Sequence, residues 1–380
     1  MVSTYPPTTC GLATFTSSLR TALADLRGST DSLPVVSVVD VPGDSSKGVI
    51  YQHLNGDPAS LVTAVSRLNR CDVVLIQHEY GIYGGPDGAE VLDLIDRLTV
   101  PAVATLHTIP NDPTPEQEKI LESIVASTAQ TVVMSNAASL RLVSRYDIDA
   151  AKVRVIPHGA NPDLAGPLDT LNDRPVVLSW GLIGPGKGLE TAIAAFSELG
   201  DVHPRPRYVI LGDTHPKVKA RQGDSYLEGL KLQAEAAGVG DIVEFDNRYL
   251  ETASLIEMIH GVDFVLIPYD SREQATSGVL VEAIAAGKPV VATAFPHAIE
   301  MLGTGAGLVV PQGDPTAMAS AIRELLNDPA LAGRMADTAR SIGSTMYWPS
   351  VAASYEALFA ELVTEAALVP APFRDFVRIA

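Results

Sequence analysis

The chain has 380 residues, of which 46% are hydrophobic and 19% charged, and its formal net charge is -18 at pH 7. This length predicts two or three domains, the composition excludes a disordered chain, and the negative charge argues against binding to nucleic acid or anionic lipid through bulk electrostatics. Two cysteines are too few for a disulfide framework, and no apolar run reaches the roughly 18 residues of a membrane span, so we expect a cytoplasmic protein without a transmembrane segment.

The first predicted elements are a short strand at 2–4, a turn at 5–11, and a helix whose apolar residues recur at helical spacing from Leu12 to Leu26. Together they form the first βα crossover of a doubly wound parallel sheet. Gly11 lacks a Cβ, so its backbone can approach a ligand closely. On spacing alone, a plain tight turn explains this glycine equally well.

Two later strands of the same sheet end in polar residues. One buried strand passes into His78, Glu79 and Tyr80, and the strand at 101–106 is followed by His107. Ligands of open parallel sheets bind beyond the carboxyl ends of the strands, so these side chains are placed for substrate contact. For the first three, acceptor binding and an ordinary polar loop are equally supported.

A second domain begins after a linker at 161–174 that is rich in Pro, Asp and Gly. The segment 176–188 predicts a strand, a glycine-rich loop and a helix start that carries Lys187. Backbone N–H groups and one lysine charge suit a diphosphate, although the spacing of a Walker loop is absent. We therefore expect domains at 1–165 and 174–345, followed at 346–380 by a terminal helix and a tail.

The stretch from 262 to 293 predicts a strand, a polar loop, a helix and another strand, which is a βαβ unit. The helix begins near Ser277 and Gly278, where free N–H groups and the positive end of the helix dipole attract anions such as phosphate. Glu282 lies one turn further along, where its carboxylate can accept hydrogen bonds from sugar or ribose hydroxyls.

These motifs together resemble the retaining glycosyltransferases of family 4, which have the GT-B fold. The similarity covers nearly the whole chain, from Pro6 to about Leu362, and is strongest from Glu282 to Thr293. It implies an α/β protein of two Rossmann-like, doubly wound parallel-sheet domains that face a central cleft. The terminal helix would cross back onto the first domain.

The resemblance also implies a reaction. A hexose would move from a nucleotide-diphospho-sugar to a hydroxyl acceptor, with attack on the face that the leaving diphosphate occupies and with the diphosphate taking the acceptor proton. The runs Leu-Gly-x-Thr-His-Pro at 211–216 and Phe-Pro-His-Ala-Ile-Glu at 295–300 are similar to a branch associated with mannosyl transfer, which favours GDP-mannose. No metal and no further cofactor are expected.

Carried over residue by residue, the family pattern places the sugar near His107 and the diphosphate near Lys187, and places the ribose at Glu282. The expected catalytic residues are His107, Lys187, Glu273 and Gln274, and the expected acceptor residues are His78, Glu79 and Tyr80. The expected donor-binding residues are Gly11, Leu12, Gly184, Lys187, Asn247, Arg248, Tyr249, Arg272, Thr276, Ser277, Gly278, Val279 and Glu282.

The chain departs from the family pattern at two places. The first of two family glutamates is displaced to Glu273 or replaced by Gln274, and Leu182 stands where the family has an arginine. Arg248 or Arg272 would supply the missing charge, and the sequence does not choose between them.

These departures leave two other functions open, a catalytically weak or silent sugar-nucleotide-binding protein and a glucosyltransferase that uses UDP- or ADP-glucose. A GT-B epimerase has no specific support, and a dehydrogenase is disfavoured because Gly-x-Gly-x-x-Gly is absent. The acceptor, the linkage, the oligomeric state and the role of the tail stay open.

Overall fold

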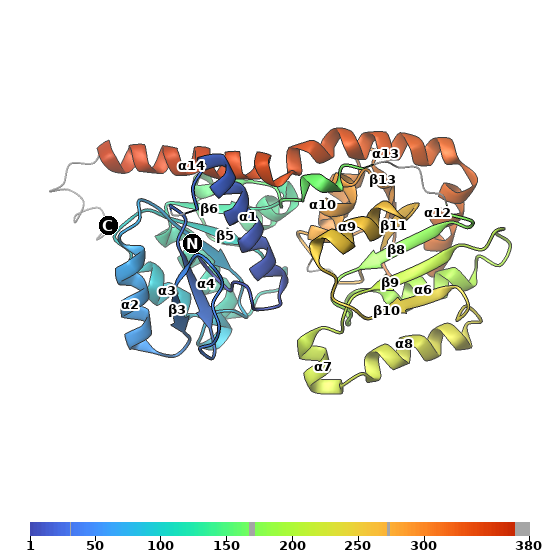
Figure 1. Cartoon of the computed structure of the whole chain (residues 1–380), viewed down its shortest axis with the longest axis horizontal. Coiled ribbons are helices and arrows are strands. Elements are labelled where there is room, and N and C mark those ends of the chain that lie inside the picture. Colours follow the sequence, from blue (N-terminus) through green and yellow to red (C-terminus); the bar gives the residue numbers. More distant parts are fainter. Residues whose placement is uncertain (31, 167–171, 272–273, 369–380) are drawn as a thin grey trace. The chain divides into compact units, whose positions relative to one another are not determined.

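The computed structural model describes residues 1–30, 32–166, 172–271 and 274–368, which form two compact units (Figure 1). Unit 1 comprises Met1–Gly159 and the chain from Trp348 onward, and unit 2 comprises Ala160–Tyr347. Unit 2 thus begins before the expected boundary at 165. The reason is local, because Ala160 pairs with Tyr347 and donates its N–H to the Met346 carbonyl at 2.8 Å.

Unit 1 is built on a seven-stranded parallel sheet with the strand order β3-β2-β1-β4-β5-β6-β7. The order reverses after β1, as in doubly wound folds, so ligands would meet the carboxyl edge near β1 and β4. Its strands are β1 (Val2–Ser3), β2 (Val35–Val39), β3 (Val49–Leu54), β4 (Val74–His78), β5 (Ala102–Leu106), β6 (Gln130–Val133) and β7 (Val153–Val155).

Helices cover both faces of this sheet, and the long terminal helix α14 (Trp348–Leu368) packs against α1 (Gly11–Arg27) within unit 1 (Figure 1). Phe15, Leu19 and Tyr355 are buried in this contact, and the Tyr355 hydroxyl lies 3.0 Å from that of Thr105 on β5. The other elements are α2 (Pro58–Leu68), α3 (Glu90–Ile95), α4 (Pro115–Ser127), α5 (Asn136–Arg145) and short 3-10 turns at Pro86–Gly88 and Ala150–Lys152.

Unit 2 contains a six-stranded parallel sheet with the order β10-β9-β8-β11-β12-β13. Apolar residues of the strands alternate between two buried clusters, one on each face. Its strands are β8 (Val176–Trp180), β9 (Arg207–Leu211), β10 (Val243–Asp246), β11 (Phe264–Ile267), β12 (Val290–Thr293) and β13 (Gly307–Val310).

The helices of unit 2 lie on both faces of its sheet, which confirms the predicted α/β class with two doubly wound parallel sheets (Figure 1). The helices are α6 (Leu189–Ser197), α7 (Pro216–Gln222), α8 (Ser225–Ala236), α9 (Thr252–His260), α10 (Gly278–Ala285), α11 (Pro296–Leu302), α12 (Pro315–Asn327) and α13 (Pro329–Gly343), with 3-10 turns at Pro162–Leu164 and Ser344–Met346.

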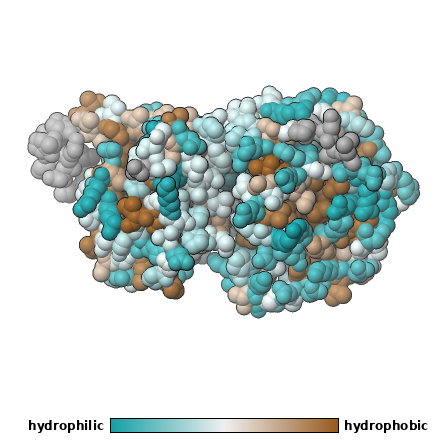
Figure 2. Space-filling view, in the orientation of Figure 1, coloured by the Kyte–Doolittle hydropathy of each residue, from teal (hydrophilic) through white to brown (hydrophobic). Residues whose placement is uncertain are grey.

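Polar and apolar residues are interspersed on the face of the molecule that Figure 2 shows. Among the described residues, no helix is both long enough and apolar enough to span a membrane.

Candidate functional site

The glycine-rich loop of unit 2 connects β8 to α6 and is held from two sides. Ile183 donates its N–H to the Asp213 carbonyl at 2.9 Å and accepts the N–H of His215 at 2.8 Å, so the segment after β9 fixes one side. On the other side, a Cβ on Gly188 would lie 1.8 Å from the Pro268 carbonyl oxygen, and Gly188 has φ +64. Only glycine fits this position, which explains part of the glycine-rich pattern.

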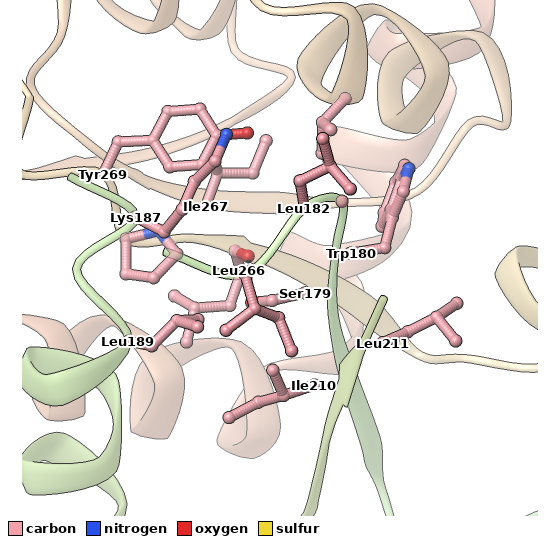
Figure 3. Close-up of a pocket in the computed structure, with 14 residues that line it drawn as sticks. Ser179, Trp180, Leu182, Lys187, Leu189, Ile210, Leu211, Leu266, Ile267 and Tyr269 are labelled. Carbon is pink, nitrogen blue, oxygen red and sulfur yellow. Dashed lines mark hydrogen bonds between the residues drawn. The ribbon is translucent and has the colours of Figure 1, made fainter. Parts of the chain in front are cut away.

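Lys187 extends from this loop over the ring of Tyr269, with Nζ 4.2 Å from the ring centroid. Both side chains line a small pocket at the carboxyl ends of β8, β9 and β11, and Leu182 and Trp180 lie on its other side (Figure 3). The aromatic face attracts the ammonium by about 0.5–2 kcal/mol and orients it. The structure therefore places Lys187 at the edge of the sheet where a ligand is expected.

The start of α10 borders the same pocket through Val279. The Ser277 hydroxyl accepts the N–H of Leu280 at 3.2 Å, and the N–H of Ser277 donates to His297 Nδ1 at 3.0 Å. Ser277 is therefore engaged in the fold, contrary to its expected use as an N–H donor to an anion. Gly278 and Val279 are the first two residues of the helix, where backbone N–H groups have no acceptor within the helix, so these two are the expected donors to an anion.

Glu282 is held by a residue that the sequence did not single out. The indole N–H of Trp180 donates to Glu282 Oε2 at 3.0 Å, across 102 positions of the chain. Burial raises the pKa of the Glu282 carboxyl, and the hydrogen bond from Trp180 opposes that rise. Trp180 occupies Oε2, so Oε1 is the oxygen that remains for a ligand hydroxyl.

Of the two expected replacements for the family arginine, the structure describes only Arg248, which is paired outside the pocket. Arg248 donates to both carboxylate oxygens of Asp246, at 2.7 Å and 2.6 Å, and its side chain is 71% exposed. Its charge is thus compensated locally. Leu182 lines the pocket, while Arg272 and Glu273 lie outside the described residues.

The remaining residues expected at the donor site fall into two groups. Asn247 and Tyr249 are exposed beyond β10, and Tyr249 keeps 57% of its surface. Gln274 and Thr276 belong to the segment before α10, where the Gln274 side-chain amide donates to the Thr276 carbonyl. Gly184 packs beside the segment after β9, since a Cβ there would lie 3.5 Å from His215 Cβ.

In unit 1, His107 follows β5 and contacts Gln77, with Nε2 2.7 Å from the amide oxygen. That oxygen can only accept, so the ring proton lies on Nε2 and Nδ1 remains an acceptor. Burial lowers the pKa of His107 to about 3, and nearby His158 and His78 add to the effect. Phe15 packs edge-on at 4.8 Å. His107 is therefore a neutral, oriented imidazole.

Gly11 and Leu12 begin α1 after Cys10, whose sulfur accepts the N–H of Ala13 at 3.4 Å. A Cβ on Gly11 would meet no atom within 4 Å, so the space beside this residue is open. This openness suits the expected approach of a ligand, although the glycine is not required by packing.

The expected acceptor residues are mostly interior. His78 is fully buried between the rings of Tyr80 and Tyr83, and burial lowers its pKa to about 3. The Tyr80 hydroxyl donates to the Gln117 carbonyl at 3.1 Å. Half-buried Glu79 accepts from the Tyr80 N–H at 3.0 Å. His78 and Tyr80 thus have packing roles, because residues at the end of a strand alternate between faces and these two point inward.

No group of three or more His, Cys, Asp or Glu side chains that could hold a metal ion occurs in the described ranges. The expectation that transfer needs no metal stays a prediction.

Two family models match the chain. The model described as "Glycosyltransferase Family 4" matches residues 22–164, and the model described as "Glycosyl transferases group 1" matches residues 165–342. The two matches run without a break from 22 to 342, which is well over half of the chain.

Curated relatives and solved structures agree with these models. The chain is 28% identical to D-inositol 3-phosphate glycosyltransferase of Corynebacterium jeikeium over 71% of this chain and 68% of the relative. It is 26% identical to the enzyme of that name from Corynebacterium aurimucosum, over 92% of this chain and 86% of the relative.

Among solved structures, a glycosyltransferase from Rickettsia africae superposes with a TM-score of 0.75 at 16% identity over 95% of this chain and 97% of that one. HepE from Anabaena, solved with UDP and glucose, superposes with a TM-score of 0.72 at 16% identity, over 94% of this chain and 98% of HepE. At this identity the structures establish a shared fold.

Proposed function

Because the chain belongs to the family 4 glycosyltransferases of the GT-B fold, we propose that it moves a hexose from a nucleotide-diphospho-sugar to a hydroxyl group of an acceptor with retention of configuration. One observation carries the proposal. Lys187, Trp180 and, at the start of α10, Val279 line one pocket at the carboxyl edge of the sheet of unit 2, and Trp180 donates a hydrogen bond to Glu282. A cation, helix N–H groups and a carboxylate there match the phosphates and the ribose of a nucleotide.

The first chemical task is to stabilise the departing diphosphate. When the bond between the anomeric carbon and the phosphate oxygen breaks, its electron pair goes to the diphosphate. Lys187 and the N–H groups of Gly278 and Val279 meet that charge with fixed dipoles and one full charge. The helix dipole adds about half a charge at the start of α10.

The second task is to hold the nucleoside. Glu282 has one oxygen engaged by Trp180 and a second oxygen available, so it would accept a ribose hydroxyl in a fixed direction. A carboxylate that is oriented before binding pays less conformational entropy when the ligand arrives.

Retention would follow from attack on the face that the diphosphate leaves. The acceptor oxygen forms the new bond to the anomeric carbon, and its proton passes to an oxygen of the departing diphosphate, so no protein base is consumed. His107, which is neutral and presents Nδ1 as an acceptor, remains the candidate for a sugar hydroxyl that the family resemblance implies.

Two donors are the leading candidates. The runs at 211–216 and 295–300 are similar to a mannosyl branch and favour GDP-mannose. HepE, a neighbour in fold, was solved with UDP and glucose, which makes UDP-glucose the second candidate.

A thermal-shift screen with GDP-mannose, UDP-glucose and ADP-glucose tests the proposal. A ligand that binds the folded protein at about 100 times its dissociation constant raises the stability by about 2.7 kcal/mol. We expect a rise in Tm with one of these donors and with its nucleoside diphosphate. If no sugar nucleotide shifts the melting of a folded protein at millimolar concentration, the proposal is wrong.

A further inference from the structure

The start of α10 is completed by a residue from another helix. His297 lies in α11, is 2% exposed, and accepts the N–H of Ser277 on Nδ1 at 3.0 Å. Ser277 is also 2% exposed, so this N–H is removed from water. A buried N–H that loses its acceptor costs about 1–3 kcal/mol, and the contact therefore fixes the backbone just before α10.

A comparison within the chain shows what this contact replaces. Helix α4 begins with a capping box, in which the side chain of Gln117 accepts the N–H of Thr114 at 3.0 Å and Thr114 Oγ1 accepts the N–H of Gln117 at 3.2 Å. In α10 the N-cap residue is Ser277, and the third helical residue is Leu280, which is apolar and buried. Leu280 cannot accept the N–H of the cap residue, so the reciprocal half of the box is missing from α10 itself.

His297 supplies that missing half from outside the helix. Nδ1 accepts a hydrogen bond only when it carries no proton, so the ring proton lies on Nε2. The result is a cap made by two helices. The Ser277 hydroxyl accepts the N–H of Leu280, and His297 Nδ1 accepts the N–H of Ser277.

The same turn of α11 also supports the lysine side of the pocket. Phe295, two residues before His297, stacks on Tyr269 with the ring centroids 5.3 Å apart. The ammonium of Lys187 also lies over the Tyr269 ring, 4.2 Å from its centroid. Two residues at the start of α11 thus hold the two parts of the pocket that would face a diphosphate.

We propose that His297 is a positioning residue for the donor diphosphate, which acts by completing the cap of α10 and so directing the N–H groups of Gly278 and Val279 at the phosphates. The inference rests on the proposed function of this pocket. His297 touches the backbone of the helix start and acts on the ligand through it. The effect of His297 on diphosphate binding therefore comes from the position of its acceptor nitrogen and not from the volume of its ring.

The test separates acceptor position from ring volume. In His297→Asn, the amide oxygen falls near the place of Nδ1, whereas in His297→Gln it falls one bond further out, near the place of Nε2. The matched control is His260→Gln in the same unit. The His260 ring lies 3.0 Å from the Leu164 carbonyl, and this residue ends α9 before β11, at the amino edge of the sheet.

Affinity for UDP, GDP and ADP is measured by calorimetry on the full chain, after circular dichroism has confirmed the fold of each variant. We expect His297→Gln to weaken the binding of the preferred diphosphate about tenfold or more, and His297→Asn and His260→Gln to stay within about twofold of wild type. Equal affinity in wild type and His297→Gln would overturn the inference. Equal losses in His297→Asn and His297→Gln would also overturn it, because ring volume would then be the cause.

Hydrogen exchange without ligand provides a second test, which applies also if a variant binds too weakly for calorimetry. Hydrogen exchange of the peptide over 276–284 should be faster in His297→Gln than in His297→Asn, while the peptide over 225–236 in α8 exchanges alike in both. Equal exchange at 276–284 would reject the role of His297. A wild-type protein that binds none of UDP, GDP and ADP would reject the proposed function, and the inference with it.

Discussion

Lys187 is the residue on which the charge argument depends most, because its ammonium lies over Tyr269 at the pocket where we propose that the diphosphate binds. Replacement by alanine should leave the fold intact and cost about 2–4 kcal/mol of transition-state stabilisation. Turnover of the preferred donor measures this loss. Lys231→Ala, on the exposed face of α8 beside Glu228, is the control and should keep full activity. Wild-type turnover in a folded Lys187→Ala protein would remove Lys187 from the mechanism.

Glu282 gives a prediction in which stability and binding move in opposite directions. Its pKa is raised by burial from the ordinary value of 4.5, so the folded state disfavours the ionised form. The stability that the protonated form provides is present below the ordinary pKa and is lost as pH rises through the folded pKa. Glu282→Gln removes this loss and still offers an oxygen to Trp180. We expect the variant to be more stable than wild type near neutral pH, with no difference near about pH 4.

The same variant should bind nucleoside diphosphate more weakly than wild type, by more than the about 0.5 kcal/mol typical of a surface change. Calorimetry with GDP and UDP measures the binding, and urea unfolding at two pH values measures the stability. An unchanged dissociation constant would argue that Glu282 has no contact with the nucleotide.

Arg248 and Leu182 bear on the missing cation. Arg248 is paired with Asp246 and largely exposed, so Arg248→Met should change the donor KM by no more than about twofold, the equivalent of about 0.5 kcal/mol. Leu182 lines the pocket, and Leu182→Arg should lower the donor KM by adding a guanidinium there. A large rise in KM in Arg248→Met would show that Arg248 leaves Asp246 to bind the donor.

At the scale of elements, the glycine-rich loop is shaped by contacts that a side chain would break. A Cβ on Gly188 would overlap the Pro268 carbonyl, and its φ of +64 disfavours other residues. Gly188→Ala should therefore lower the free energy of unfolding by about 2 kcal/mol or more. The control is Gly229→Ala in α8, where a Cβ meets nothing within 4 Å and alanine should stabilise by about 0.5–1 kcal/mol. Equal unfolding midpoints for the two variants would contradict this account of the loop.

Local sequence patterns predict helices and strands well, but they predict poorly which distant residues form hydrogen bonds with one another. The unit from 262 to 293 was predictable, because an apolar run ends at Pro268 and the helix stops before Gly287, and the structure has β11, α10 and β12 there. The bonds of Trp180 to Glu282 and of Ser277 to His297 join residues 102 and 20 positions apart. No local pattern encodes them, because they depend on how strands are ordered in the sheet.

The direction of a side chain near the end of a strand is equally hard to predict from the sequence. His78 closes β4 and was expected to meet an acceptor, yet its ring is buried beside Tyr83. The sequence places a residue at the carboxyl edge of a sheet, but the direction of its side chain follows from the pleat and from the helices that cover that face. The polar edge strand β3 was not predicted for a related reason, since polar residues such as Gln52 and His53 hide the alternation.

At the scale of the molecule, two parallel sheets with separate cores agree with the family models, and the proposed function assigns the donor to the pocket of unit 2. The net charge of -18 gives the chain no overall attraction for polyanions. The proposed binding of a diphosphate would therefore depend on the local arrangement of Lys187 and the start of α10.

Donor cleavage followed by proton NMR tests the central claim most directly. The wild-type protein is incubated separately with GDP-mannose, UDP-glucose and ADP-glucose, with water as the acceptor, since many transferases hydrolyse their donor slowly. We expect one donor to be consumed, to release its nucleoside diphosphate, and to yield a sugar whose first-formed anomer keeps the configuration of the donor. If no donor is consumed, or if the first-formed anomer is inverted, the protein is not the retaining hexosyltransferase that the pocket of unit 2 supports.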